Sequence, residues 1–162
     1  MPYTFRNHLL EKDLQELTVV MQSTGLFYDF EIEVALEVLQ SILDRGEASG
    51  YYCIIATKNG VCVGYAVYGP TPCTLSGWDI YWMAVQKELQ GKGLGSDLIK
   101  RTEQEIALQG GTAVWIETSG RPAYIPTRKF YEKHQYLKLA EIPGFYAPGD
   151  SKVIYGKTIS VF

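Results

Sequence analysis

The stretch Val85-Gln86-Lys87-Glu88-Leu89-Gln90-Gly91-Lys92-Gly93-Leu94-Gly95-Ser96 decides how the rest of the sequence is interpreted. It lies between an apolar run, Trp78 to Val85, and a run whose apolar residues recur every three to four positions. Glycines let the backbone turn successive N–H groups toward one point, and a following helix adds the positive end of its dipole. The stretch therefore predicts a strand, a turn that binds an anion of phosphate size, and a helix.

Two common phosphate-binding patterns do not fit this turn. A Walker loop needs Gly-x-x-x-x-Gly-Lys-Ser/Thr, and no such string occurs. A dinucleotide fingerprint needs Gly-x-Gly-x-x-Gly, and its third glycine would fall on Ser96 or on Leu98. The pattern that fits is Gln-x-x-Gly-x-Gly, whose fixed positions are Gln90, Gly93 and Gly95.

This pattern resembles the pyrophosphate-binding motif of the GCN5-related N-acetyltransferase (GNAT) family, which holds acetyl-coenzyme A. A second stretch, Phe130 to Tyr136, resembles the family's aromatic-Tyr-x-x-x-Gly-aromatic signature, with Gln135 in place of the glycine. Where the family often has Asn and then a small residue, this sequence has Tyr124 and Thr127. The two motifs stand in the family's order, and the resemblance covers roughly Tyr51 to Ile159, preceded by a strand and two helices as in the family.

Periodicity predicts two helices and a hairpin in the first part of the chain. The first helix carries an apolar stripe at Leu10, Leu14, Leu17 and Met21. Gly25 ends this helix, and Asp29 caps a second one. Asn59-Gly60 then predicts a two-residue turn between two strands.

The predicted elements follow the order β-α-α-β-β-β-α-β-α-β-β. The predicted strands are 3–6, 51–57, 61–67, 78–85, 113–118, 137–142 and 152–159, and a short helix covers 127–134. Hairpins demand antiparallel pairs, whereas the strand–helix–strand crossover demands a parallel pair. We therefore expect an α/β fold with a mixed sheet, and the resemblance implies that this is the GNAT fold.

Composition bounds the class of protein. The 162 residues suggest a single domain over 1–162, since domains average roughly 150 residues. A net charge of −3 argues against a nucleic-acid partner, and no apolar run approaches the roughly 18 residues of a membrane span. Cys53, Cys62 and Cys73 share no metal-ligand spacing, so no metal is expected and a reducing, cytoplasmic location fits best.

The resemblance also implies which residues hold acetyl-coenzyme A. Backbone N–H groups from Gln90 to Ser96 would bind the pyrophosphate, and the strand end at Met83-Ala84-Val85 would pair with the pantetheine arm. A main-chain N–H near Ala84 or Val85 would point at the thioester oxygen. The expected coenzyme-binding residues are Met83, Ala84, Val85, Gln90, Gly91, Lys92, Gly93, Leu94, Gly95, Ser96, Thr118 and Tyr124. Lys92, Arg121 and Arg128 could neutralise phosphate charge, although single surface cations are more often just solvated.

The resemblance assigns the general acid to Tyr131. A phenol has a pKa of about 10 and an alkyl thiol about 8.5, so protonating the leaving thiolate is uphill by roughly 2 kcal/mol. Asp79 is the first candidate base, because a carboxylate stands at the same spacing before the motif in the histone-acetylating branch of the family. Glu117 is the second candidate, ordered water is the third, and Asp79 could equally be an exposed residue at a strand end.

Three functions remain open on the sequence. The first is an N-acetyltransferase that passes acetyl from acetyl-coenzyme A directly to a primary amine in a ternary complex. The second is a non-catalytic module of the same fold that binds or senses acyl-coenzyme A. The third, an unrelated phosphate-binding protein, is disfavoured by the failed patterns. The amine acceptor is not readable from the residues, and the resemblance implies that a homodimer through terminal strands is an option.

Overall fold

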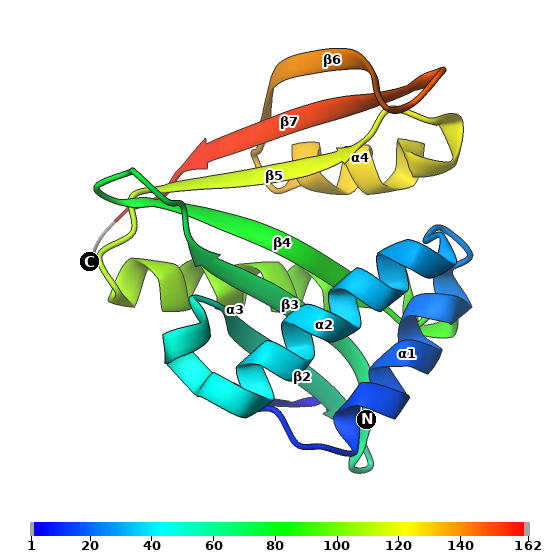
Figure 1. The fold of residues 1–162 in the computed structure, drawn as a ribbon, viewed down its shortest axis with the longest axis vertical. Helices are drawn as coiled ribbons and strands as arrows, with labels where there is room; N and C mark the ends of the chain where they lie inside the picture. Colours follow the sequence, from blue (N-terminus) through cyan, green and yellow to red (C-terminus); the bar gives the residue numbers. More distant parts are fainter. Residues whose placement is uncertain (1, 161–162) are drawn as a thin grey trace. The chain divides into compact units, whose positions relative to one another are not determined.

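The computed structural model describes residues 2–160, and in them the predicted α/β class and element order are confirmed (Figure 1). The strands are β1 (Thr4–Arg6), β2 (Tyr52–Lys58), β3 (Val61–Pro70), β4 (Gly77–Val85), β5 (Ala113–Ser119), β6 (Leu137–Ala147) and β7 (Asp150–Thr158). The helices are α1 (Asp13–Thr24), α2 (Asp29–Arg45), α3 (Leu94–Leu108) and α4 (Ile125–Lys133), with short 3-10 turns η1 (Gly46–Ser49), η2 (Lys87–Leu89) and η3 (Pro122–Tyr124).

The chain divides into two compact units, and β4 contributes to both of them. The first unit is Met1–Gly69 with Tyr81–Glu105, and the second is Pro70–Ile80 with Ile106–Phe162. Hydrogen-bonded neighbours run β1-β2-β3-β4 in one direction from β4 and β4-β5-β7-β6 in the other. The β4–β5 pair is parallel, whereas β1–β2, β2–β3, β5–β7 and β6–β7 are antiparallel, which confirms the predicted mixed sheet.

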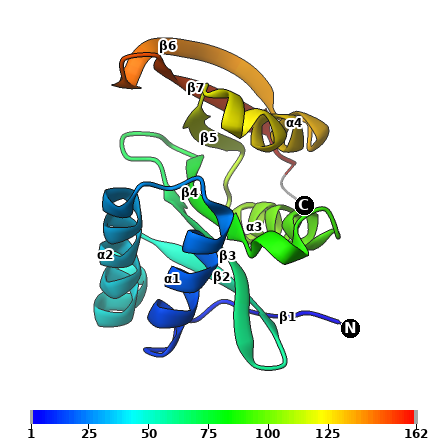
Figure 2. The same cartoon turned by 90° about the vertical axis from the view of Figure 1, so that its right-hand side faces the viewer.

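Side chains of α1, α2, β2 and β3 form most of the core cluster of the first unit. Its fully buried large residues include Leu17, Met21, Leu39, Ile55 and Tyr65. The Tyr65 hydroxyl lies 3.0 Å from Met21 Sδ on α1, whereas a side chain at Gly64 would lie 3.2 Å from Leu98 on α3. Because neighbouring strand residues point to opposite faces, α1 and α3 cover opposite faces of β3 (Figure 2).

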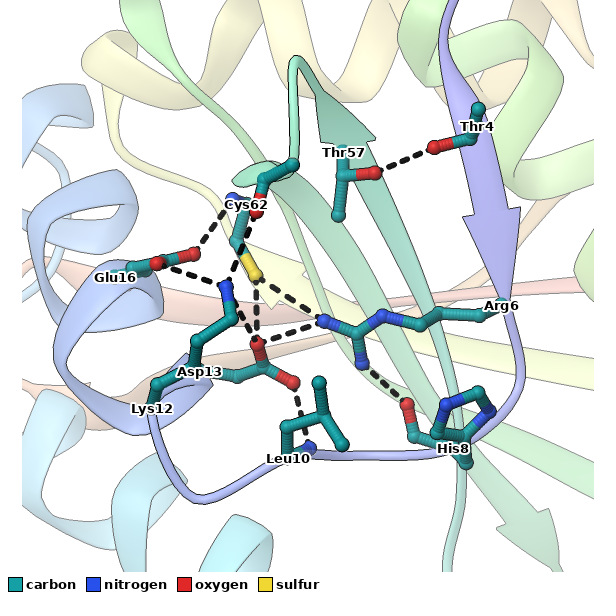
Figure 3. Close-up of polar contacts among 10 residues, drawn as sticks. Thr4, Arg6, His8, Leu10, Lys12, Asp13, Glu16, Thr57 and Cys62 are labelled. Atoms are coloured by element: carbon teal, nitrogen blue, oxygen red, sulfur yellow. Dashed lines mark hydrogen bonds and ion pairs between the residues drawn. The ribbon is translucent and has the colours of Figure 1, made fainter.

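A buried ion pair ties β1 to α1 (Figure 3). Arg6 Nη2 lies 2.7 Å from Asp13 Oδ1, and the Leu10 N–H donates to Asp13 Oδ2 at 2.7 Å. The Cys62 thiol of β3 donates to the same carboxylate at 3.2 Å. Burial alone would raise the pKa of Asp13, but hydrogen bonds from these three groups outweigh it and hold the pKa below its ordinary value. Burial, with hydrogen bonds to Glu16 and Asp13, raises the pKa of Cys62, so this group is a neutral thiol.

The second unit packs α4 against one face of β5 and β7. Ile116 lies opposite Tyr155 in the β5–β7 ladder, and Tyr155 contacts Tyr131 of α4 with ring centroids 5.8 Å apart. The opposite face carries Trp115, which lies opposite Gly156 and packs over it together with Leu139. Because side chains alternate along each strand, these positions show which of the candidate catalytic residues lie on the same face of the sheet.

Several predicted boundaries are wrong by a few residues. Helix α1 begins at Asp13, so Leu10 lies outside it and is exposed. Asp29 is the first residue of α2 instead of its cap; Tyr28 is the cap, and its N–H donates to Glu31 Oε1 at 3.2 Å. Strand β6 runs to Ala147 and not to the predicted end at residue 142, because β6 is an edge strand and tolerates Pro143.

None of the helices in residues 2–160 is both long enough and apolar enough to cross a membrane. The longest, α2, has 17 residues and exposes Glu33 and Glu37.

Candidate functional site

The glycine-rich turn lies in the first unit, where it joins the end of β4 to α3. Gly91 and Gly93 have φ of 74° and 94°, in the left-handed region that L residues rarely adopt. No atom lies within 4 Å of where a Cβ would stand at either residue, so backbone conformation and not crowding requires glycine here. The Gln90 side chain donates to Val85 O at 3.1 Å and fastens the turn to the strand end.

Helix α3 presents backbone donors to this turn. The Asp97 N–H donates to Gly93 O at 3.0 Å, and this hydrogen bond closes the first turn of the helix. The N–H groups of Leu94 and Gly95 come before it in the chain, where the helix itself offers them no acceptor. Leu94 has a fully buried side chain, which leaves its main chain as its contribution to a ligand, while Lys92 is exposed. The positive end of the helix dipole and N–H groups of this kind favour an anion, so binding of an anion at this turn stays a prediction.

The expected pantetheine strand ends beside this turn, also in the first unit. Ala84 is buried, and Met83 and Val85 are half-buried. The next residue, Gln86, donates its N–H to Val63 O of β3 at 2.9 Å. The structure therefore brings the predicted pantetheine and pyrophosphate segments together in one unit.

Tyr131 lies in the second unit, on the buried side of α4. Its side chain is 7% exposed, and it makes ring contacts with Phe130, Tyr136 and Tyr155. Burial, with the neighbouring Tyr124 and Tyr155, raises the pKa of Tyr131 above its ordinary value. The phenol is therefore fully protonated at neutral pH, as a proton donor must be.

Gln135, which stands where the signature has glycine, lies in the left-handed region that favours glycine. Gln135 adopts φ of 69°, one of three non-glycine residues with positive φ in the described chain. Its N–H donates to Glu132 O at 3.0 Å, and the next residue, Tyr136, returns to Tyr131 O at 3.0 Å. The exchange of glycine for glutamine thus costs strain but leaves the turn in place.

Both candidate bases lie on the face of the second unit opposite α4. Asp79 of β4 lies opposite Trp115 of β5 in the parallel ladder, and Glu117 follows two positions later on the same face. Thr71 Oγ1 donates to Asp79 Oδ2 at 2.8 Å. Glu117 is half exposed, and its Oε2 lies 2.8 Å from Lys152 Nζ. The Asp79 carboxylate thus accepts a hydrogen bond from the Thr71 hydroxyl, whereas one oxygen of Glu117 is in an ion pair with the Lys152 ammonium.

The remaining predicted contacts, Thr118 and Tyr124, are both buried in the second unit. Thr118 lies opposite Val153, on the face that α4 covers. Sequence reasoning missed what surrounds them: Asp150, buried at the start of β7, binds Ser119 and Arg121. No local pattern signals this group, because its members come from separate elements.

Comparisons with known proteins agree with the sequence resemblance. The family model of the acetyltransferase (GNAT) family matches residues 13–136. None of the curated proteins matches the chain. A crystal structure from Desulfovibrio desulfuricans, described as an acetyltransferase of the GNAT family, matches with a TM-score of 0.95 and 38% identity, over 98% of this chain and 100% of that one.

Two more distant structures share the fold. The ribosomal-protein-S18-alanine N-acetyltransferase of Escherichia coli matches with a TM-score of 0.78 and 19% identity, over 99% of this chain and 96% of that one. The PaiA N-acetyltransferase of Thermoplasma acidophilum, solved with coenzyme A, matches with a TM-score of 0.77 and 16% identity, over 98% of this chain and all of the other.

Proposed function

We propose that this chain, which belongs to the acetyltransferase (GNAT) family, transfers acetyl from acetyl-coenzyme A directly to a primary amine in a ternary complex. The observation that carries the proposal is the turn between β4 and α3. Its two left-handed glycines and the free end of α3 suit a pyrophosphate, and the pantetheine strand ends at the same turn. No part of the proposal requires a metal.

Three groups of the chain would perform the transfer. A main-chain N–H near Ala84 or Val85 polarises the thioester carbonyl while the amine nitrogen attacks its carbon. Asp79 takes the proton that the amine loses, directly or through water. The C–S bond then breaks, and Tyr131 gives its proton to the thiolate.

The placement of Asp79 and Tyr131, both in the second unit, supports their division of roles. Asp79 lies on the face of β4 and β5 opposite α4, and Tyr131 lies on α4. The attacking amine and the departing thiolate are different substituents of one tetrahedral carbon, so the base and the acid need not be neighbours. Burial raises the pKa of Tyr131, so the phenol keeps its proton until a thiolate departs.

Acetyl-coenzyme A titration of the full chain tests the binding part of the proposal. We expect Gly93→Ala to weaken binding by about tenfold or more, because a Cβ at φ of 94° forces the N–H groups of the turn out of alignment. Gly60→Ala is the matched control, since Gly60 has φ of 79° and an equally open surrounding in the β2–β3 hairpin. Equal affinities in both variants would remove the turn from the binding site.

Thiol release with an amine panel tests the transfer itself. The panel holds a diamine, a lysine-containing peptide and a peptide with a free N-terminal alanine, the last suggested by the Escherichia coli neighbour. Binding of acetyl-coenzyme A without thiol release from any amine would favour the sensing module instead.

Two matched carboxyl-to-amide variants test the base. We expect Asp79→Asn to lower kcat by about 10²-fold at neutral pH, and Glu117→Gln to change it by less than about threefold. The reason is that the Glu117 carboxylate is engaged by Lys152, whereas Asp79 contacts the Thr71 hydroxyl. Full activity in both variants would leave ordered water as the base.

The proposal extends to location and assembly. Three free cysteines, two of them buried, fit the reducing cytoplasm.

A homodimer through β6 is supported by its exposed apolar residues Leu137, Leu139, Ile142, Phe145 and Tyr146. Sedimentation of the full chain at two concentrations checks this assembly.

A further inference from the structure

A buried carboxylate and an arginine hold the connection between β5 and α4, residues 120–124, which is called the corner below. Asp150, 4% exposed, accepts a short hydrogen bond from the Ser119 hydroxyl at the end of β5. Its other oxygen lies 3.3 Å from Arg121 Nε. The Arg121 N–H in turn donates to Ser119 Oγ at 3.1 Å, and its guanidinium lies 5.2 Å from the centre of the Tyr124 ring. The first residue of β7 thus holds the chain segment that carries Tyr124.

A second arginine clamps α4 to the same corner. Arg128 Nη1, on the first turns of α4, donates to Ser119 O at 2.8 Å and to Arg121 O at 3.0 Å. Both carbonyls belong to the chain just before α4, so one guanidinium nitrogen joins the helix to the strand end. The sequence analysis considered Arg121 and Arg128 as groups that could neutralise phosphate charge. In the structure both guanidinium groups contact protein atoms at the corner.

This arrangement suits positioning better than it suits stability. The ion pair between the buried Asp150 and the half-buried Arg121 gains little net free energy over well-packed apolar groups, because desolvation of the carboxylate offsets the attraction. Helix α4 has nine residues, which is too short to be stable in isolation. Its place is therefore set by side-chain anchors, and Arg128 is three residues from Tyr131, on the adjacent helical turn.

We infer that Arg128 and Asp150 are positioning residues for acetyl transfer, which act through Tyr131 by fixing α4 and the Tyr124 segment against the end of β5. The inference rests on the proposed function. A shift of a reacting group by about 1 Å can cost a factor of up to about 10² in rate, so a loosened clamp has a measurable effect.

A double-mutant cycle tests this role, with acetyl-coenzyme A and the fastest amine of the panel as probes. We expect Arg128→Gln to lower kcat about tenfold and to change KM for acetyl-coenzyme A less than about threefold. In a Tyr131→Phe background the same change lowers kcat less than about twofold, because the group being positioned is gone. Arg128→Lys, which keeps one charged donor nitrogen, recovers part of the loss. Lys129→Gln, at an exposed neighbour on α4, is the matched control.

Amide hydrogen exchange of the free chain gives a readout without activity. We expect Arg128→Gln and the isosteric Asp150→Asn to speed exchange across 125–133 and to leave 13–45 unchanged, whereas Lys129→Gln changes neither segment. Unchanged exchange in α4, or an equal loss of kcat with and without Tyr131, would overturn the positioning role. If the wild-type protein releases no thiol with any amine, the proposed function is overturned. The hydrogen-exchange result does not depend on that assay, so the two failures can be told apart.

Discussion

Tyr131→Phe should lower kcat by a factor of about 10² to 10³ while leaving the affinity for acetyl-coenzyme A within about twofold. The substitution removes only the hydroxyl, so the ring contacts with Tyr136 and Tyr155 persist. The leaving thiolate then has to take its proton from solvent. Steady-state kinetics with thiol detection, alongside titration of the coenzyme, measure the two quantities separately.

Tyr136→Phe is the matched control for this prediction, because it removes a hydroxyl from a neighbouring tyrosine that is 1% exposed. We expect its kcat to stay within about threefold of the wild type. The raised pKa of Tyr131 adds a second check: the phenol keeps its proton through the neutral and mildly basic range, so its titration produces no basic limb below about pH 10. A kcat that Tyr131→Phe leaves intact would exclude the phenol as the acid.

Asp13→Ala should destabilise the fold by about 3–5 kcal/mol, the range found when one partner of a buried ion pair is removed. Asp13 is fully buried, and its loss leaves the largely buried Arg6 guanidinium and the Leu10 N–H without their acceptor. At about 2–4 °C for each kcal/mol, the melting temperature falls by roughly 6–20 °C. Thermal unfolding followed by circular dichroism measures the change.

Lys12→Ala is the control, since the exposed Lys12 contacts the same cluster through Glu16 and should leave the melting temperature nearly unchanged. Acid provides a further test with a definite sign. The folded pKa of Asp13 is below its unfolded value of about 3.9, so its contribution is complete above that pH and is lost as the pH falls through the folded pKa. The stability gap between wild type and Asp13→Asn should therefore be constant near neutrality and narrow below about pH 4.

The parts of the fold that the sequence predicts well depend on local backbone demands. Asn59 and Gly60 both adopt positive φ, 53° and 79°, as a two-residue hairpin turn requires. Gly25 likewise ends α1 in the left-handed conformation. These requirements involve adjacent residues, so a single stretch of sequence carries the whole signal.

The parts that sequence misses depend on partners far apart in the chain. Asp13 has an ordinary helix-start position in the sequence, yet it binds Arg6 of β1 and Cys62 of β3. Asp150 follows a turn and would be assigned to the surface, yet it is buried against Ser119 and Arg121. The candidate site divides in the same way: the glycine turn was predictable, whereas the anchors around α4 needed the tertiary structure.

The open space around Gly93 means that its constraint is one of handedness and not of size. A φ of 94° is strained for an L residue, but a D residue adopts it readily, because chirality inverts the sign of the preferred φ. A D-alanine placed there by chemical ligation would keep this φ without strain and would restrict the backbone of the unfolded chain. The mirror-image residue would preserve the anion site, while its natural enantiomer, identical in atoms, would distort it.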